Sequence, residues 1–379
     1  MIIKKASILE IGIPFKFTFR HALASRNKGH GILVRVEDEE GRTGWGESAP
    51  RDYVTGETAT SVITALESSL VPAFLNKSYQ EFEEVAAEIE GILATLPRNQ
   101  HAAFCALELA VMDLAGKVFG RSCGDLVGPT CQDTMFFSGV ISADGVESAA
   151  KACELVKKFG FTRVKLKIGL SPKDDQEILR CARDILGDEV GFRVDANCAW
   201  TAEEALKSLE ALQEFNLEGV EQPLAGNDLE GLVWLTERSP TPVITDESLA
   251  SYEDAQTLVD RRACHVFNIR ISKCAGLVNS VRIRDLALRN DMGCMMGAQV
   301  GETAILSAAG RHFAARSPQL MFLEGSYGTI LLESDVATRD LTIAPGGRAE
   351  ALDGFGLGIT VDETLVNPHV SNRLELGDS

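Results

Sequence analysis

Residues 162–170 read TRVKLKIGL, an apolar run that carries two lysines one residue apart. Successive side chains of a β-strand point to opposite faces, so Lys165 and Lys167 lie on one face and the apolar residues around them on the other. A lone segment of this kind is typical of an edge strand with its lysines in water, because lysines are mostly solvated. The neighbouring segments decide between that interpretation and a buried strand.

From about residue 135, short apolar strands alternate with helical patterns. Eight candidate strands follow one another at intervals of roughly 25 to 28 residues: FFSGVIS (136–142), VKLKIG (164–169), GFRVDAN (191–197), GVEQP (219–223), PVITDES (242–248), VFNIRISK (266–273), GCMMGAQ (293–299) and MFLEGS (321–326). Each interval holds one strand and one helix, and eight such units predict a (β/α)8-type barrel. An open doubly wound sheet is the alternative, but no G-x-G-x-x-G follows the first strand.

The segment before residue 128 has a different pattern. KKASILEIGIP resembles a strand, and GILVRVED and TGWGES flank a turn at EEGR, which predicts a hairpin. Helical periodicity follows over 60–74, 79–96 and 101–119. We therefore predict an α/β protein with an α+β capping domain at 1–128, a barrel at 129–326 that holds the active site, and a Gly-rich C-terminal segment at 327–379 that returns to the capping domain.

The composition narrows the possible partners. The net charge of −18 leaves no basic face for nucleic acid or an anionic membrane, although a few local cations can still bind a small anion. No apolar run reaches the ~18–20 residues that span a bilayer, and the N-terminus lacks the features of a signal peptide. Nine scattered cysteines without a CxxC indicate reduced thiols. We expect a soluble, cytoplasmic protein.

Three of the predicted strands end in a carboxylate. Asp195, Glu221 and Asp246 follow one another at intervals of 26 and 25 residues. In a barrel these strand ends meet at the face that carries active sites. Capping of the following helix would explain Asp195 or Asp246 separately, but not three acids at this spacing. An all-oxygen donor set suits a hard cation, so we predict Mg²⁺, with Mn²⁺ as an alternative.

Lysines stand on both sides of these acids. Lys165 and Lys167 end the second strand, and Lys273 ends the sixth. Beside a metal and away from water, a lysine has a lowered pKa and can act as a base near neutrality. Two such lysines can take a proton from one face of a substrate and return one to the other, while the third keeps its charge. We therefore expect the lysines to point into a barrel mouth, which rejects the edge-strand interpretation.

Together these motifs resemble the enolase superfamily, in its muconate-lactonizing subgroup (mandelate racemase/muconate lactonizing enzyme). The resemblance covers nearly the whole chain, through GWGES (44–48), YVTGET (53–58), ALELAVMDLAGKVFG (106–120), K-x-K (165–167), VDAN (194–197), EQP (221–223), DES (246–248) and NIRISKCAGL (268–277). It implies a modified TIM barrel, a small carboxylate substrate and a homo-oligomer. It also implies the chemistry known for this superfamily, which is Mg²⁺-dependent abstraction of the proton α to a carboxylate through an enolate.

The resemblance also assigns roles to residues. The implied metal ligands are the three acids at strand ends, Asp195, Glu221 and Asp246. The implied catalytic lysines are an acid–base pair and an electrostatic helper, Lys167, Lys273 and Lys165. The residues implied to orient these ligands are Asn197 and Glu247. The mandelate-racemase branch is less similar, because GCMMGAQ offers no histidine base.

The sequence departs from the pattern of relatives in two segments. Many relatives carry a glutamate where Gly297 stands, and dipeptide epimerases carry Asp-x-Asp where Gly325 and Tyr327 stand. A substrate ammonium would lose charged hydrogen bonds worth about 1.5–3 kcal/mol each, which disfavours a dipeptide. Specificity is expected from 15–26 and 50–54 as loops that close over the barrel mouth. The candidate substrate contacts are Phe19, Arg20, Arg51, Tyr53, Gly297 and Tyr327.

Several outcomes of this chemistry stay open. The enolate can lead to isomerisation, as in a cycloisomerase, racemase or epimerase, or to syn elimination of the o-succinylbenzoate synthase type. A non-catalytic barrel that only binds ligands would predict the loss of a lysine or an acid, and none is lost. Schiff-base chemistry on Lys167 or Lys273 also fits a barrel; borohydride trapping would support it, and dependence on Mg²⁺ would contradict it.

Overall fold

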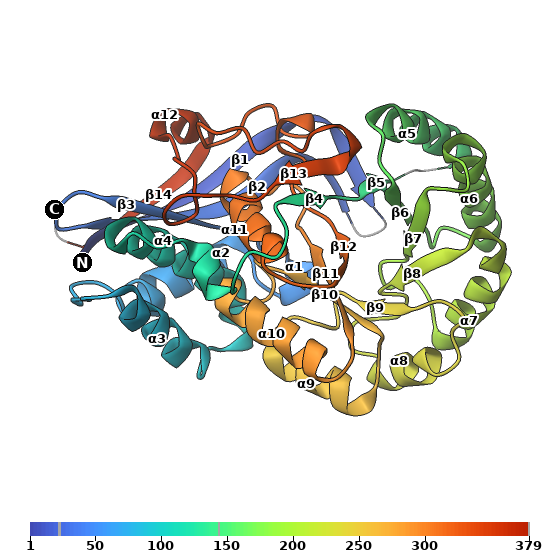
Figure 1. Ribbon diagram of the computed structural model, residues 1–379, viewed down its shortest axis with the longest axis horizontal. Helices are drawn as coiled ribbons and strands as arrows, with labels where there is room; N and C mark the ends of the chain where they lie inside the picture. The colour runs from blue at the N-terminus through green and yellow to red at the C-terminus, as the bar shows by residue number, and fades with distance from the viewer. Residues whose placement is uncertain (22–23, 143–144, 378–379) are drawn as a thin grey trace.

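Eight parallel strands form one sheet in the part of the chain that the computed structural model describes, which is residues 1–21, 24–142 and 145–377. Side chains are described for 1–17, 26–142 and 145–377. The strands are β5 Gly139–Ile141, β6 Arg163–Lys167, β7 Gly191–Asp195, β8 Leu217–Glu221, β9 Val243–Thr245, β10 Val266–Arg270, β11 Gly293–Gly297 and β12 Leu320–Leu323. Ser138 N–H donates to the Leu323 carbonyl at 2.8 Å and joins the two ends of the sheet, so the strands close into a barrel (Figure 1).

Helices connect the barrel strands and cover the outside of the barrel (Figure 1). Between the eight strands, the described chain forms α5 Val146–Phe159, α6 Pro172–Leu186, α7 Ala202–Ala211, α8 Leu229–Thr236, α9 Tyr252–Arg261, α10 Leu277–Arg289 and α11 Ala304–Ala315. Helix α6 shows the local cause: the Ser171 side chain caps it by accepting from Asp174 N–H, and Pro172 fits its first turn. The sequence therefore predicted these units correctly.

The chain departs from a regular barrel after β12. Where an eighth helix would begin, it forms the 3-10 helix η5, Gly328–Ile330. The next residues are held by the N-terminal domain, because Lys16 N–H donates to the Leu331 carbonyl at 2.8 Å and Phe15 forms a bridge with Leu332. This segment therefore joins the two domains beside the barrel mouth.

The inner face of the barrel changes from apolar to polar along the strands. A buried apolar cluster comprises Ile244, Val266, Met295 and Phe322. Residues two positions further along a strand lie on the same face. In three of the four strands the residue at that position is polar: Asp246, Asn268 and Glu324. The carboxyl end of the barrel is therefore lined by polar and charged side chains.

The N-terminal domain contains a four-stranded antiparallel sheet in the order β14-β1-β2-β3. Its strands are β1 Ile3–His21, β2 Ala24–Asp38, β3 Thr43–Ser48 and β14 Val370–Gly377. Because β14 comes from the end of the chain and pairs with β1, the tail returns to the capping domain as predicted. The tail also supplies β13 Arg348–Glu350, which pairs with β4 Thr134–Phe136. The divisions at residues 128 and 326 stay a prediction.

Helix α4, His101–Phe119, packs directly on β3. A Cβ at Gly44 or Gly46 would overlap the backbone of α4, so the two glycines of GWGES permit this close approach. The remaining elements are α1 Asp52–Thr55, α2 Ala59–Ala65, its π-helical continuation η1 Leu66–Leu70, α3 Phe82–Leu93, η2 Arg98–Gln100, η3 Cys123–Leu126, η4 Gln213–Phe215, η6 Pro345–Gly347, α12 Glu363–Val366 and η7 Asn367–His369.

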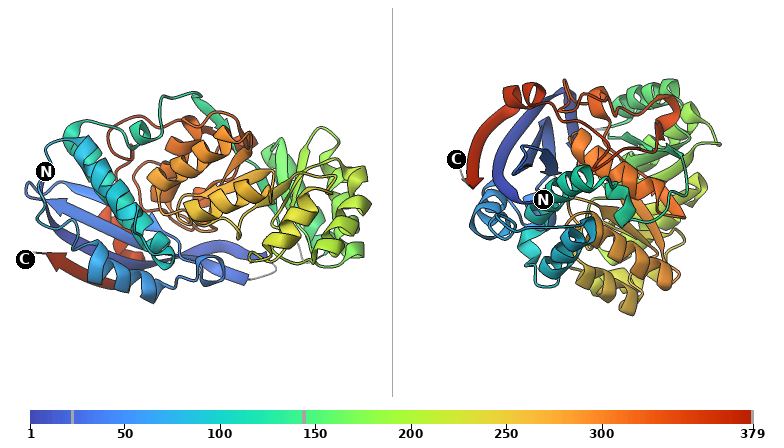
Figure 2. Two further views of the ribbon diagram at one scale, coloured as in Figure 1. Left: turned by 90° about the horizontal axis from the view of Figure 1, so that it is seen from below. Right: turned by 60° about the vertical axis from the view of Figure 1, so that its left-hand side comes forward.

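The segment 15–26 was predicted to be a loop, and this prediction is wrong. Residues 15–21 continue β1 and residues 24–26 begin β2, and the pairing runs on to His21 and Ala24 with an irregularity between Pro14 and Phe19. Pro14 argues against a continuous strand, whereas the alternation in FKFTF favours one, and the pairing of the two strands decides the outcome. The resulting hairpin extends from the sheet toward the barrel (Figure 2).

Candidate active site

The three acids predicted from the sequence meet at the carboxyl end of the barrel. Asp195 ends β7, Glu221 ends β8 and is its register partner, and Asp246 follows β9. Their exposed fractions are 0%, 0% and 1%. The helices that follow Asp195 and Asp246 are capped by Thr201 and Ser251, so helix capping does not explain these acids.

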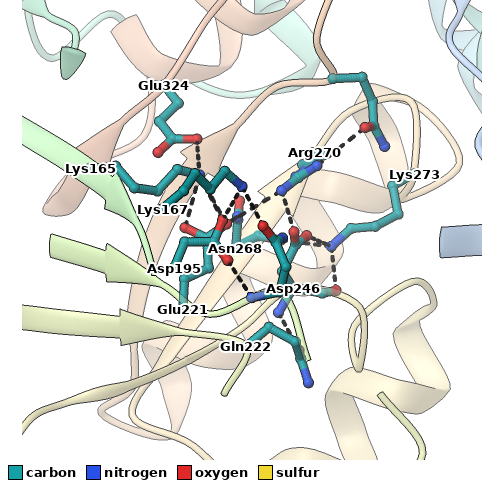
Figure 3. Close-up of polar contacts among 12 residues, drawn as sticks. Lys165, Lys167, Asp195, Glu221, Gln222, Asp246, Asn268, Arg270, Lys273 and Glu324 are labelled. Atoms are coloured by element: carbon teal, nitrogen blue, oxygen red, sulfur yellow. Dashed lines mark hydrogen bonds and ion pairs between the residues drawn. The ribbon is translucent and has the colours of Figure 1, made fainter. Parts of the chain in front are cut away.

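Lys165 lies at the centre of this group (Figure 3). Its Nζ atom is 2.8 Å from Glu324 Oε2, 3.1 Å from Glu221 Oε1 and 3.3 Å from Asp195 Oδ2, and the residue is 3% exposed. Burial acts to lower the pKa of Lys165, but Glu221, Glu324 and Asp195 outweigh it and raise this pKa above its usual value. Lys165 therefore keeps its charge.

Lys167 and Lys273 approach the acids from opposite sides (Figure 3). Lys167 Nζ is 2.6 Å from Asp195 Oδ2 and 2.8 Å from Asn197 Oδ1. Lys273 Nζ is 2.7 Å from Asp246 Oδ1 and donates to the Asp246 and Asn268 carbonyls at 2.6 and 3.1 Å. The flanking arrangement predicted from the sequence is therefore present in the structure.

Four further residues of the site were not identified from the sequence: Arg193, Asn268, Arg270 and Glu324. Glu324 contacts both Lys165 and Arg193. Asn268 Nδ2 donates to Glu221 Oε1 at 3.0 Å, and Arg270 Nη2 contacts Glu221 at 3.3 Å and also contacts Asp246. Glu324 carried the same signal as the other acids, because it directly follows an apolar strand in MFLEGS.

The acids are not arranged as a ready metal centre. No three His, Cys, Asp or Glu side chains among the described residues form such a group, because the lysines and Arg270 hold the carboxylate oxygens. The donor set still fits a hard cation, since it is all carboxylate and comes from adjacent strand ends. Burial raises the pKa of Glu221 to about 7, so a cation beside it would restore its ionised form. The Arg270 guanidinium contacts both Glu221 and Asp246, so the space between these two carboxylates already holds a positive charge.

A cavity lies between these residues and the capping domain. Its charged and polar wall comprises Lys165, Lys167, Asn197, Glu247, Arg270 and Glu324. Its neutral wall includes Val54, Val140, Ala298, Val300, Tyr327 and Leu331. Arg51 and Tyr53 line it from the capping domain. Lys273 is not among the lining residues; it is 1% exposed and its Nζ contacts Asp246.

Three other candidate residues line the cavity: Asn197, Glu247 and Tyr327. Asn197 N–H donates to Asp195 Oδ1 at 2.9 Å, so Asn197 can orient both Asp195 and Lys167. Glu247 lines the cavity, and its buried Oε2 has no hydrogen-bond partner among the described residues. Tyr327 lines the cavity and its hydroxyl donates to the Ser138 carbonyl at 3.1 Å.

Gly297, by contrast, does not line this cavity. A Cβ at this position would overlap Asn268 Oδ1, so the glycine makes room for that side chain. The side chains of Phe19 and Arg20 lie outside the described residues.

Two family models cover most of the chain. Residues 4–128 match the N-terminal domain of mandelate racemase and muconate lactonizing enzyme, and residues 147–365 match the enolase C-terminal domain-like model. The chain belongs to the mandelate racemase/muconate lactonizing enzyme family. The superfamily resemblance and the modified TIM barrel predicted from the sequence are thereby confirmed. No helix among the described residues is long and apolar enough to span a membrane.

Members of this family with known activities are similar over almost their full length. A hydrophobic dipeptide epimerase of Enterococcus faecalis is 30% identical, with 95% of this chain and 100% of that protein covered. An o-succinylbenzoate synthase of Geobacillus stearothermophilus is 30% identical, with 94% and 92% covered. The crystal structure of N-succinyl Arg/Lys racemase from Bacillus cereus superposes with a TM-score of 0.91 at 25% identity, covering 99% and 100%. An Enterococcus faecalis dipeptide epimerase complexed with Mg and a dipeptide has a TM-score of 0.87 at 28% identity, with 95% and 100% covered.

Proposed function

We propose that this protein is a Mg²⁺-dependent enzyme that removes the proton α to the carboxylate of a small substrate and returns a proton to the opposite face. The proposal rests on one observation. Lys167 and Lys273 lie on opposite sides of three buried carboxylates. A racemase or epimerase needs that arrangement, because one lysine must face each side of the planar enolate.

The charges of the site balance for this reaction. Five carboxylates, Asp195, Glu221, Asp246, Glu247 and Glu324, face five cations, Lys165, Lys167, Arg193, Arg270 and Lys273. This cluster is neutral when every group is ionised. One lysine must lose its proton to act as a base, Mg²⁺ brings two positive charges, and the substrate carboxylate brings one negative charge. The loaded site is therefore neutral again, which a buried position requires.

Asp195, Glu221 and Asp246 would hold the Mg²⁺, and Mn²⁺ could replace it. When bound, the metal supplies Lewis-acid stabilisation of the negative charge that develops on the substrate carboxylate. Asp195 and Asp246, which now contact Lys167 and Lys273, would hold the cation instead, and this would leave the two lysines available for proton transfer.

Lys165 then remains as a fixed positive charge beside the developing enolate. Its retained proton, next to Glu221 and Glu324, suits electrostatic stabilisation and not proton transfer. Asn197 holds Lys167 in place through its side-chain oxygen. These are the roles expected from the sequence.

The enolate can react further in more than one way. Syn elimination of the o-succinylbenzoate synthase type and epimerisation of a dipeptide are alternatives, since relatives carry both activities. The muconate cycloisomerase type is a further alternative. A barrel that only binds ligands is disfavoured, because every lysine and acid of the constellation is present and buried or half-buried at one site. A homo-oligomer is also expected, which light scattering tests.

The proposal is tested by hydrogen–deuterium exchange at the α-carbon in D₂O with Mg²⁺, followed by mass spectrometry. The panel contains N-acyl amino acids, dipeptides, muconates and a succinylbenzoate precursor. We expect exchange that EDTA abolishes, that Lys167→Ala abolishes for one enantiomer of the substrate, and that Lys173→Ala leaves intact. Lys173 is a suitable control because its side chain is 83% exposed, on α6 outside the site. Exchange that persists in EDTA would overturn the proposal.

A further inference from the structure

Lys273 lies in a tight turn between β10 and α10 that does not cap the helix it leads into. Ala275 has a φ of 59°, a left-handed conformation that is costly for a residue with a Cβ, and Gly276 follows with a φ of 95°. Gly276 is the N-cap residue of α10, and it has no side chain to bind the first N–H groups of the helix. These N–H groups belong to the buried residues Leu277 and Val278 and need acceptors. The turn therefore depends on a contact from elsewhere in the chain.

The capping domain supplies this contact through Glu108 on α4. Leu277 N–H donates to Glu108 Oε2 at 2.6 Å, and Val278 N–H donates to Glu108 Oε1 at 2.8 Å. Glu108 is 0% exposed, so water does not compete for these hydrogen bonds. A Cβ at position 276 would overlap Glu108 Oε2, so Gly276 makes room for the carboxyl group. One side chain of the capping domain therefore holds the end of the turn that carries Lys273.

A second contact from the capping domain holds the beginning of the same turn. Ala49 directly follows β3, and its N–H donates to Ser272 Oγ at 2.9 Å. Ser272 is buried and directly precedes Lys273. The backbone of Lys273 therefore lies between two anchoring points, and the capping domain provides both.

We propose that Glu108 is a positioning residue for Lys273, which it fixes relative to the substrate by holding the turn from the capping domain. Lys167 differs, because it ends β6 and its Nζ bonds to Asp195 and Asn197, which belong to the barrel. Loss of the Glu108 contact should therefore impair proton transfer on the substrate face that Lys273 serves and spare the face that Lys167 serves. The inference rests on the proposed function for the role of the two lysines.

The contact is tested without a substrate by amide hydrogen exchange of the whole protein and mass spectrometry of a peptide that spans 271–278. Glu108→Gln keeps the shape of the side chain but turns an NH₂ group toward one of the two N–H donors. We expect exchange in 271–278 to become about 5- to 100-fold faster, the range for one buried donor without a partner. The matched control is Glu57→Gln, because Glu57 accepts from Ala102 and Ala103 N–H at 3.0 and 3.2 Å inside the capping domain. The control should leave 271–278 unchanged, and unchanged exchange in Glu108→Gln would overturn the inference.

The effect on Lys273 is tested by α-proton exchange in D₂O with Mg²⁺, followed separately for the two enantiomers of an exchanging substrate. The enantiomer that Lys273→Ala no longer exchanges reports on this lysine. Glu108→Gln should lower kcat for that enantiomer about 10- to 100-fold with little change in KM, because a displaced base reacts more slowly. The rate for the other enantiomer should stay nearly unchanged. A protein that is only less stable would lose both rates together, so an equal loss for both enantiomers would overturn the inference.

Ser272→Ala is the second variant, because it removes the other anchoring point without touching Glu108. It should slow the same enantiomer selectively, and an equal loss for both enantiomers would again count against the inference. Faster amide exchange in 271–278 of Glu108→Gln, combined with a native protein that exchanges no substrate, would support the role of Glu108 in holding the turn and count against the proposed function.

Discussion

Replacing Glu324 with glutamine removes one negative charge from the buried cluster and keeps the size of the side chain. In the native protein Glu324 Oε2 is 2.8 Å from Lys165 Nζ, and Oε1 contacts Arg193. Both cations are at most 3% exposed. Glu324→Gln would therefore leave the buried cluster with one positive charge in excess.

The expected loss of folding stability is large. Removing one partner of a buried ion pair costs about 3–5 kcal/mol. An unfolding entropy of about 2.1 cal/mol/K per residue amounts to about 0.8 kcal/mol/K for 379 residues, so Tm should fall by about 4–6 °C. The exposed acid Glu177, which lies 3.7 Å from Lys173, provides the control Glu177→Gln, and its Tm should change by less than about 1 °C.

The effect should also depend on pH. Burial alone would raise the pKa of Glu324, but Lys165 and Arg193 lower it below its usual value of 4.5. Its ionised form therefore stabilises the fold above about pH 4.5, and this contribution is lost as the pH falls further. Scanning calorimetry of both proteins should show a difference in Tm that is nearly constant between pH 7 and about pH 5 and shrinks as the pH falls below about 4.5. A Glu324→Gln protein as stable as the native one at pH 7 would refute this account of the cluster.

Three further predictions concern the fold and the metal. Gly46→Ala should destabilise the protein by several kcal/mol in urea titrations, because its Cβ would overlap the Ala106 carbonyl, whereas Gly91→Ala in α3 meets open space and should be neutral or stabilising by up to about 1 kcal/mol. Burial raises the pKa of Glu108 to about 8, so the folded state holds a proton that the unfolded state releases above about pH 4.5. The free energy of unfolding should therefore fall as the pH rises from about 4.5 to about 8. Glu108→Gln should reduce this dependence on pH, which urea titrations at a series of pH values measure. Mg²⁺ at 100 times its Kd should stabilise the protein by about 2.7 kcal/mol in thermal melts, and Asp246→Asn should abolish this gain.

The sequence predicted the barrel and the main site residues because both depend on spacing. One strand and one helix per interval define the barrel, and each of Asp195 and Glu221 ends its strand, so their neighbourhood follows from the parallel register. The same argument applies to Glu324, which follows the eighth strand, although the prediction from the sequence did not include it. Arg270 could have been found from its position two residues after Asn268 on the inner face of β10.

Other features depend on contacts between distant parts of the chain. The hairpin at 15–21 and 24–26 is extended because the two strands pair, although Pro14 favours a break. Nothing local in the sequence brings Arg26, on β2, near Arg51, which precedes α1. Gly297 was predicted to contact substrate, whereas its place is set by the side chain of Asn268 on the adjacent strand.

The central claim is that Lys167 and Lys273 serve opposite faces of one substrate. It is tested most directly by following α-proton exchange in D₂O separately for the two enantiomers of an exchanging substrate, with Lys167→Ala and Lys273→Ala. The account predicts that neither variant interconverts the enantiomers and that each still exchanges only one of them, a different one in the two variants. Exchange of the same enantiomer by both variants, or interconversion by either, would contradict the account.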